Sequence, residues 1–526
     1  DDKKMKLSIP SSVVVVVVAA GISSVFNEYE CHAWSTKAKI FVGMRRSIFN
    51  NFNNVNNFNT QYNNNHNVHP RHHQWHQTTR RNSQTHLYNN ISNNDNNSND
   101  FNVVLRPSTD PEAFDSLKIG YGRVHRYVRD ETDATGDPSA EYVMWYHGRG
   151  QNFDESKKLP PLSTGRIGRA ISRNGLAWER VSEGSASEDH VGVSLGLNNE
   201  SWWGFDTAHV GLGQVMLPMS TPAVMTEGGV YLMYYMGGNF EETPIVQYMS
   251  GEGGLNNIPE EATIQGMNMK IGVALSQDGI SWGRVEGDDP TGAIMAPYTK
   301  NDPNMKSMAS MRDDDDSLLN LPEELYCGWP DVIVTNDPSD QDNNPQSTKL
   351  KSNFHMYYST MTKHDKVKSI ALAVSDEGFR WLKRGICLKP DETGPDAAGC
   401  ARATVVRKAS FDEDTSIWTN APGWIMFYEG ISPEDNKHRV LMAESDDGRK
   451  WTKMGIALDV GESDQAWDNA GVGSPHIIRL DDGSSRMYYT GQGADGSTAI
   501  GVAKCEGDGS KGSLWSREQA SFTFSL

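Results

Sequence analysis

The sequence predicts an all-β fold: a five-bladed β-propeller in a single domain, with its ring closed by an N-terminal strand. Three recurring strings predict it, namely an acid-bearing strand, a buried aromatic strand and a hairpin that ends in Trp. Together they supply about four strands per repeat, which is the blade of a propeller. No helical periodicity of any length competes with them.

The first string combines an aromatic residue, Asp and, further on, Gly beside branched apolar residues. It reads FDSLKIGYGRV (114–124), FDTAHVGLGQV (205–215) and WDNAGVGSPHI (467–477), with looser copies PEELYCGWPDV (322–332) and PDAAGCARATV (395–405). We expect it to form the inner strand of each blade. The acidic position is filled in every copy, by Asp115, Asp206, Glu323, Asp396 and Asp468.

The second string is aromatic and apolar, and it is too short for a helix. Its copies are YVMWYHG (142–148), YLMYYMG (231–237), FHMYYST (354–360), WIMFYEG (424–430) and RMYYTGQ (486–492). We expect these segments to be strands that are buried on both faces. The five copies set the predicted number of blades.

The third string is a hairpin with Gly at its turn. Its copies are IGRAISRNGLAW (167–178), IGVALSQDGISW (271–282), IALAVSDEGFRW (370–381), VLMAESDDGRKW (440–451) and a degenerate IGVAKCEGDG (500–509). Pairs such as Asn174-Gly175 supply the positive φ angles that a tight turn needs. The fifth blade lacks a good outer strand, so we expect FNVVLR (101–106) to pair with it and close the ring.

The first hundred residues are expected to lie outside this fold. Residues 1–33 combine a leftover N-terminus, a short basic start and an apolar run of the length found in signal peptides. Residues 34–100 are Asn-rich, and no Asp or Glu occurs from Cys31 to Asn94, so we expect a disordered transit or linker segment. The pattern is similar to the bipartite plastid presequence of algae with complex plastids; plain secretion is the alternative.

The composition narrows the partners of the remaining 101–526 domain. The chain has a formal net charge of -19. An acidic body repels nucleic acid and anionic membranes, so neither is expected as a partner. A neutral ligand such as a sugar is compatible with this charge. The five cysteines are irregularly spaced and suggest no disulfide framework.

Five blades with Ser-x-[Asp/Asn]-Gly-x-x-Trp hairpins resemble the arabinanase, invertase and levansucrase clan of glycoside hydrolases. The resemblance implies acids that project into a central pocket, two of them flanking the scissile bond of a glycan or oligosaccharide. Tyr121 and Leu212 occupy the positions at which this clan carries its first two acids. Gly328 occupies the position of the invertase general acid. Two functions therefore stay open: a glycoside hydrolase-like enzyme, or a catalytically inactive propeller that binds carbohydrate or a protein partner.

The candidate site residues are mostly those that break the repeat, because one site needs one acid and one base. For catalysis we select Asp206, Asp331 and Glu429, although an acid repeated in every blade is also explained by a turn-capping role. The substrate-binding candidates are His147, Arg149, His209, Trp329, Arg402 and His476. The clan resemblance also makes His476 a candidate for holding a calcium ion in the central channel, and no other cofactor is expected.

Overall fold

Strands make up almost all of the regular structure of this protein. The computed structural model describes residues 100–128, 140–152, 165–182, 191–216, 230–248, 259, 261–300, 321–335, 354–510, 512 and 515–520, which all belong to one unit. The helical structure of these residues is confined to the 3-10 turn η2 (Ile245–Tyr248), so the all-β prediction is confirmed. In the same residues no helix is long and apolar enough to cross a membrane. The predicted signal peptide and residues 34–99 of the predicted transit segment lie outside the described residues.

We divide the described strands into five mainly antiparallel groups, numbered 1 to 5 in chain order from residue 118; a parallel pairing of His438 with Gly471 joins groups 4 and 5 into one nine-stranded sheet. Group 1 is β2 (Lys118–Val128), β3 (Ala140–Arg149), β4 (Gly165–Ser172) and β5 (Glu179–Arg180), with β6 (Val193–Leu195) also on β4. Group 2 is β7 (His209–Met216), β8 (Tyr231–Gly238), β11 (Lys270–Ser276) and β12 (Gly283–Val285). A separate small ladder joins β9 (Thr243–Pro244) and β10 (Thr263–Ile264).

Groups 3 and 4 repeat the same order of strands. Group 3 is β13 (Glu324–Val334), β14 (Phe354–Thr362), β15 (Lys368–Ser375) and β16 (Leu382–Leu388). Group 4 is β17 (Gly399–Asp412), β18 (Ile417–Ile431), β19 (His438–Ser445) and β20 (Thr452–Leu458). In each of groups 1 to 4 the first strand comes from the acid-bearing string, the second from the aromatic string and the last two from the hairpin, as predicted.

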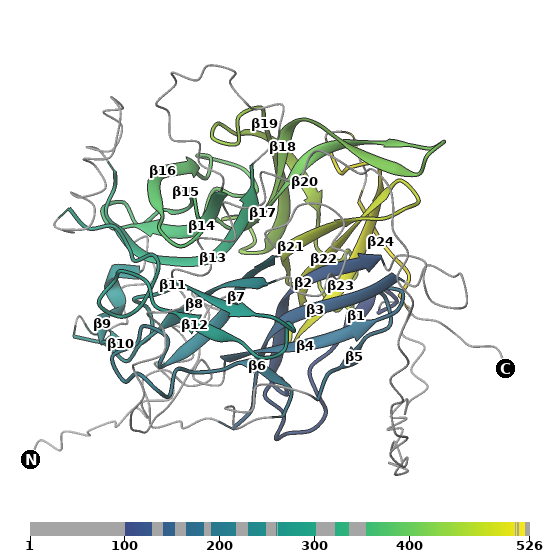
Figure 1. Cartoon of the computed structure of the whole chain (residues 1–526). Coiled ribbons are helices and arrows are strands. Elements are labelled where there is room, and N and C mark those ends of the chain that lie inside the picture. The colour runs from purple at the N-terminus through teal and green to yellow at the C-terminus, as the bar shows by residue number, and fades with distance from the viewer. Residues whose placement is uncertain are drawn as a thin grey trace, which may run out of the picture. The chain divides into compact units, whose positions relative to one another are not determined.

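Group 5 takes its outer strand from both ends of the described residues. Its first three strands are β21 (Gly471–Arg479), β22 (Ser484–Gln492) and β23 (Thr498–Glu506). β1 (Val103–Leu105) and β24 (Ser516–Arg517) both pair with β23, at different positions along it. The segment 101–106 therefore pairs with the last group, as the sequence predicted, and Figure 1 shows the purple β1 beside the yellow β23.

The buried apolar side chains of the described residues lie mainly between neighbouring groups. Trp145 of group 1 packs edge-on against Trp282 of group 2 at 6.3 Å between ring centroids. Met144 of group 1 shares a cluster with Tyr488 of group 5. The first strands of neighbouring groups also contact one another. β2 contacts β7 and β21, and β17 contacts β13 and β21.

The hairpin glycines connect these groups. In the four complete copies the glycine has a φ between 69° and 83°, and its N–H donates to the serine Oγ at 2.8 to 2.9 Å. The glycine carbonyl then accepts a hydrogen bond from the preceding group. The donors are Trp145 to Gly279 (2.9 Å), Tyr234 to Gly378 (3.0 Å), Tyr357 to Gly448 (2.7 Å) and Tyr488 to Gly175 (2.8 Å).

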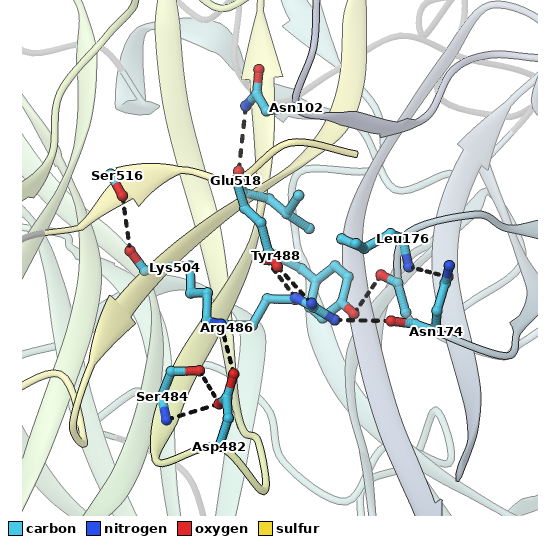
Figure 2. A network of polar contacts seen from close by, with 12 residues as sticks. Asn102, Asn174, Leu176, Asp482, Ser484, Arg486, Tyr488, Lys504, Ser516 and Glu518 are labelled. Atoms are coloured by element: carbon cyan, nitrogen blue, oxygen red, sulfur yellow. Dashed lines mark hydrogen bonds and ion pairs between the residues drawn. The ribbon is translucent and has the colours of Figure 1, made fainter. Parts of the chain in front are cut away.

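The last of these bonds runs from group 5 to group 1, and Figure 2 shows its surroundings. Arg486 lies beside Tyr488 and pairs with Glu518 through two hydrogen bonds of 2.6 and 2.7 Å. Its Nη1 also donates to the carbonyl of Asn174 at 3.2 Å. A charged pair that includes a residue near the C-terminus thus reinforces the contact with the first hairpin.

Candidate functional site

A β-bulge interrupts all five inner strands near their first residues. In four of them the residue at the bulge has a positive φ without being Gly: Tyr121 (55°), Trp329 (49°), Arg402 (49°) and Ser474 (51°). Bulges redirect side chains, and such backbone strain persists where the surrounding structure enforces it, often at functional sites. All four residues, and Leu212 of β7, line one open pocket with an empty volume of about 840 Å³.

Glu429, at the end of β18, is held in this pocket by an ion-pair cluster. Arg402 donates from Nη1 to both of its oxygens, at 2.7 and 3.0 Å, and His438 donates from Nδ1 to Oε1 at 2.6 Å. The backbone N–H of Ser474 completes the set at 3.1 Å. Burial alone would raise the pKa of Glu429, but Arg402 and His438 lower it to about 2. Its carboxyl group is therefore ionised at neutral pH and has no proton to donate.

His147 and Arg149 form a second cluster at the end of β3. Arg149 donates from Nε to Nε2 of His147 at 3.2 Å. Burial, Arg149, His209 and Arg402 together hold the pKa of His147 well below its ordinary value, so the imidazole is neutral. Because Nε2 accepts, the proton of the neutral ring is on Nδ1. That buried Nδ1 has no hydrogen-bond partner in the part of the chain that the structure describes.

The described lining of the pocket contains more positive than negative charge. Lys118, Arg149 and Arg402 line it, while Glu429 is its one carboxylate. Lys368, at the start of β15, interacts electrostatically with both Arg402 and Glu429. The pair of carboxylates that glycoside hydrolysis requires is therefore not found among the described lining residues.

Asp331 lies below the pocket and is fully buried, so it does not line it. It accepts hydrogen bonds from the backbone N–H of Val405 (2.9 Å) and the hydroxyl of Thr404 (3.2 Å). Arg123 approaches it to 3.7 Å and also donates to the carbonyls of Gly213 and Pro475. Burial raises the pKa of Asp331, against the effect of Arg123. The expected pocket acid is thus part of a buried contact among β2, β7, β13, β17 and β21.

His476 belongs to the same buried contact, and its surroundings do not fit a calcium ion. Its Nε2 donates to the carbonyl of Val124 at 2.9 Å, which leaves Nδ1 as the acceptor, 3.5 Å from Nη1 of Arg123. Burial and Arg123 lower the pKa of His476 to about 3. A guanidinium beside the ring repels a cation. No cluster of three or more metal-ligating side chains occurs in the described residues.

Asp206 lies outside the pocket and belongs to a repeated triad. Its carboxylate accepts from the hydroxyl of Tyr235 (2.8 Å) and from Nε of Arg284 (2.7 Å). Each of the other groups has an equivalent set of an acid, a Tyr of the aromatic string and a cation of the outer strand. These sets are Asp115, Tyr146 and Arg180; Glu324, Tyr358 and Lys383; Asp396, Tyr428 and Lys453; and Asp468, Tyr489 and Arg517.

Two details of the repeated acids differ from expectation. The acid of group 3 is Glu324 rather than Glu323, because β13 has a further register irregularity between Glu324 and Cys327. The donors to these carboxylates are mainly Tyr hydroxyls and cations; in addition, Glu324 accepts from the backbone N–H of Tyr298 at 2.8 Å and Asp396 from that of Asp391 at 3.2 Å. Each of these buried carboxylates therefore pairs with a cation of its own group.

The remaining candidates divide between the pocket and its surroundings. Trp329 lines the pocket, but Arg402 covers one face of its ring, 4.7 Å from the centroid. His209 lies beside the pocket without lining it, and its Nε2 bonds the carbonyl of Gly266 at 2.8 Å. Five of the nine candidates line the pocket: His147, Arg149, Trp329, Arg402 and Glu429.

Sequence reasoning missed several residues of the pocket. Lys118 occupies the same position in its copy of the first string as His209, a predicted substrate-binding residue, occupies in the next copy. His438 and Thr498 both begin the third strand of their groups, a column that changes from group to group. That variation was visible in the sequence, but only the structure shows that the starts of the third strands reach the pocket.

Comparisons with known proteins gave structural matches alone. No family model matches the chain, and no curated protein matches it. Among solved structures, a complex of BT0996 with RGII is similar at 14% identity, with 77% of this chain and 90% of that protein covered and a TM-score of 0.45. A glycosyl hydrolase from Bacteroides ovatus (13% identity, 76% and 91% covered, TM-score 0.43) and the Bombyx mori GH32 β-fructofuranosidase BmSUC1 (9%, 80% and 66%, 0.43) are also similar.

Proposed function

We propose that the protein is a closed five-bladed β-propeller that binds carbohydrate in the axial pocket and does not hydrolyse it with a pair of carboxylates. The closed ring is supported by the contacts of β2 with both β7 and β21 and by the bond from Tyr488 to Gly175. The pairing of β1 with β23 covers an edge of the last sheet that would otherwise be open. Groups 1 to 5 are then the five blades.

The observation that carries binding without hydrolysis is the state of Glu429. An acid–base pair needs one carboxyl group that keeps its proton near neutral pH. Glu429 is the one carboxylate of the described lining, and its pKa is about 2. A pocket with ordered polar groups, an aromatic ring and no proton-donating acid suits recognition of a sugar better than cleavage of a glycosidic bond.

A glycan array on the full-length protein, followed by analysis of released sugars, tests this proposal. We expect binding to a subset of glycans without products. Gln492→Trp, which adds bulk at the pocket mouth, should abolish binding, whereas Gln465→Trp on an exposed turn should not. Released sugars would favour the glycoside hydrolase-like enzyme instead. Absence of any glycan binding would favour a protein partner.

We further propose that the N-terminal segment directs the protein to a plastid, with secretion as the alternative. The support is the apolar run of residues 5–25 followed by an acid-free segment. A fluorescent fusion of residues 5–100 should reach the plastid of an algal cell with complex plastids. A fusion that stays in the cytosol would rule this proposal out.

A further inference from the structure

The described lining of the pocket is positively charged, whereas the whole chain is negatively charged. The chain has a formal net charge of -19, yet three basic side chains and one carboxylate are found among the described residues that line the pocket. Both oxygens of that carboxylate, Glu429, are already bonded to Arg402, and one of them also to His438. The negative charge is therefore directed at one side of the pocket, while Lys118 and Arg149 belong to the other side, on β2 and β3.

The basic groups are close enough to disfavour one another's charge. Burial and the neighbouring Arg149 lower the pKa of Lys118, and burial and Arg402 lower the pKa of Arg149 to about 10. Burial and Arg402 also lower the pKa of Lys368. Arg149, with a pKa of about 10, remains charged at neutral pH, so the pocket keeps a positive charge that a bound anion would stabilise.

Neutral donors accompany this charge. The neutral ring of His147 carries its proton on an Nδ1 that has no partner. The hydroxyls of Thr490 and Thr498 accept the backbone N–H groups of Tyr121 (2.8 Å) and Ile119 (3.1 Å), so each can still donate its own proton. All three side chains line the pocket. Donors beside fixed cations are the usual surroundings of a bound oxyanion in proteins.

We propose that the pocket recognises an oxyanion carried by a sugar, such as the carboxylate of a uronic acid or a sulfate or phosphate ester, with Arg149 and Lys118 as its charged contacts. The inference rests on the proposed carbohydrate binding and narrows it to acidic sugars. Arg402 is less suited as the main contact because Glu429 already neutralises it and Trp329 covers its face. Arg149 and Lys118 come from adjacent strands of group 1, so the anion would sit on that side of the pocket.

Isothermal titration calorimetry on the full-length protein tests the inference with four probes: methyl galacturonide, methyl galactoside, a sulfated methyl galactoside and inorganic phosphate. We expect the acidic sugars to bind at least about tenfold more tightly than the neutral one. Arg149→Gln should weaken the acidic sugars roughly 10- to 100-fold, the range for a lost hydrogen bond between charged groups. Lys118→Gln should have a smaller effect in the same direction. Arg380→Gln, which removes an exposed cation paired with Asp288, is the matched control and should change nothing.

The outcomes separate this inference from the proposed function. Equal affinity for the neutral and acidic sugars would overturn the inference and leave carbohydrate binding intact. Phosphate that binds as tightly as any sugar would support the oxyanion contacts and overturn carbohydrate binding. An acidic preference that survives in both Arg149→Gln and Lys118→Gln, with thermal melts showing folded variants, would overturn the assignment of these two residues.

Discussion

Asp206 and Glu429 are both almost fully buried carboxylates that pair with an arginine, but their partners come from different places. Asp206 bonds Tyr235 and Arg284 of group 2, and it also accepts from the side-chain amide of Asn198 at 3.0 Å. Glu429 bonds Arg402 and His438 within group 4, and also the backbone N–H of Ser474 in group 5. The first arrangement recurs in every group, whereas the second occurs once among the described residues and lies in the pocket.

This difference separates two uses of a buried acid. A triad satisfies polar groups within one group of strands, and it recurs in all five groups. Glu429 instead orients a pocket cation and joins groups 4 and 5, so its role depends on its position at the pocket. We infer that repetition identifies the residues that build the fold, and that the exceptions to it identify the site.

Glu429→Gln should give the largest loss of stability. The substitution keeps the shape of the residue but removes the buried charge that pairs with Arg402, and breaking a buried ion pair costs about 3 to 5 kcal/mol. Chemical denaturation measures the free energy of unfolding. Glu434→Gln, on an exposed turn, is the control and should lie within about 0.5 kcal/mol of the parent. A loss no larger than that of the control would break the comparison.

Acid should destabilise the fold in two stages. Burial lowers the pKa of His125 and His209 to about 4. Below about pH 6.5 these histidines therefore bind protons in the unfolded state but not in the folded state. Stability then falls by about 1.4 kcal/mol per pH unit for each such histidine. Glu429, with a pKa of about 2, adds a loss that begins as the pH falls below about 4.5.

Denaturation curves at several pH values between 7 and 4 test this order of events. His209→Gln should flatten the first stage by about one proton and leave the second unchanged, because Glu429 is not among the partners of His209. Unfolding free energies that agree at pH 7 and pH 5 would show that the histidines are not held neutral.

Asp396→Asn should reduce stability by about 1 to 3 kcal/mol and leave ligand binding unchanged. Asn can still accept from Tyr428, while Lys453 keeps Asp391 as a partner at 3.0 Å. Asp391→Asn is the matched control, since that carboxylate is largely exposed and its ion pair should contribute less than about 1 kcal/mol. Loss of binding in a stable Asp396→Asn protein would mean that a repeated acid serves the site.

Tyr488→Phe should give the smallest effect, about 1 kcal/mol, because it removes the hydroxyl that donates to Gly175 and leaves the ring in place. The protein holds a natural counterpart: the corresponding residue of group 4 is Phe427, which packs edge-on against Trp515 at 5.5 Å. Thermal melts of Tyr488→Phe and Tyr234→Phe should therefore shift by similar small amounts. A much larger shift for Tyr488 alone would indicate that the contact between groups 5 and 1 contributes more to stability than the contact between groups 2 and 3.

The fold was largely predictable because its signals are local. A Ser, a Gly and a Trp within one hairpin determine the turn, and the aromatic string marks the buried strand wherever it occurs. The pairing of residues 101–106 followed from the missing outer strand of the last repeat. Each of these inferences needed contacts within one repeat or a count of the copies.

The pocket was less predictable because it depends on geometry between repeats. Tyr121 and Arg402 stand at β-bulges and line the pocket, and nothing in the strings marks a positive φ at those residues. Asp331 looked unique and accessible in its string, yet it is enclosed by Arg123 and Thr404 from other groups. The sequence pattern places Glu323 in the acidic position of the third copy, whereas Glu324 takes it in the structure. The irregular register of β13 causes this difference, and aligning the copies on Gly328 cannot detect it.

The outer edge of group 5 pairs strands that are synthesised at very different times. β1 leaves the ribosome early, but β23, its partner, follows about 390 residues later. At roughly 5 to 20 residues per second, Val103 and Leu105 wait on the order of 20 to 80 seconds for that partner. Removal of any N-terminal presequence must also stop short of Asn102, whose amide group bonds both Trp467 and Tyr489. The N-terminal part of this fold is therefore completed by residues that are synthesised several hundred positions later.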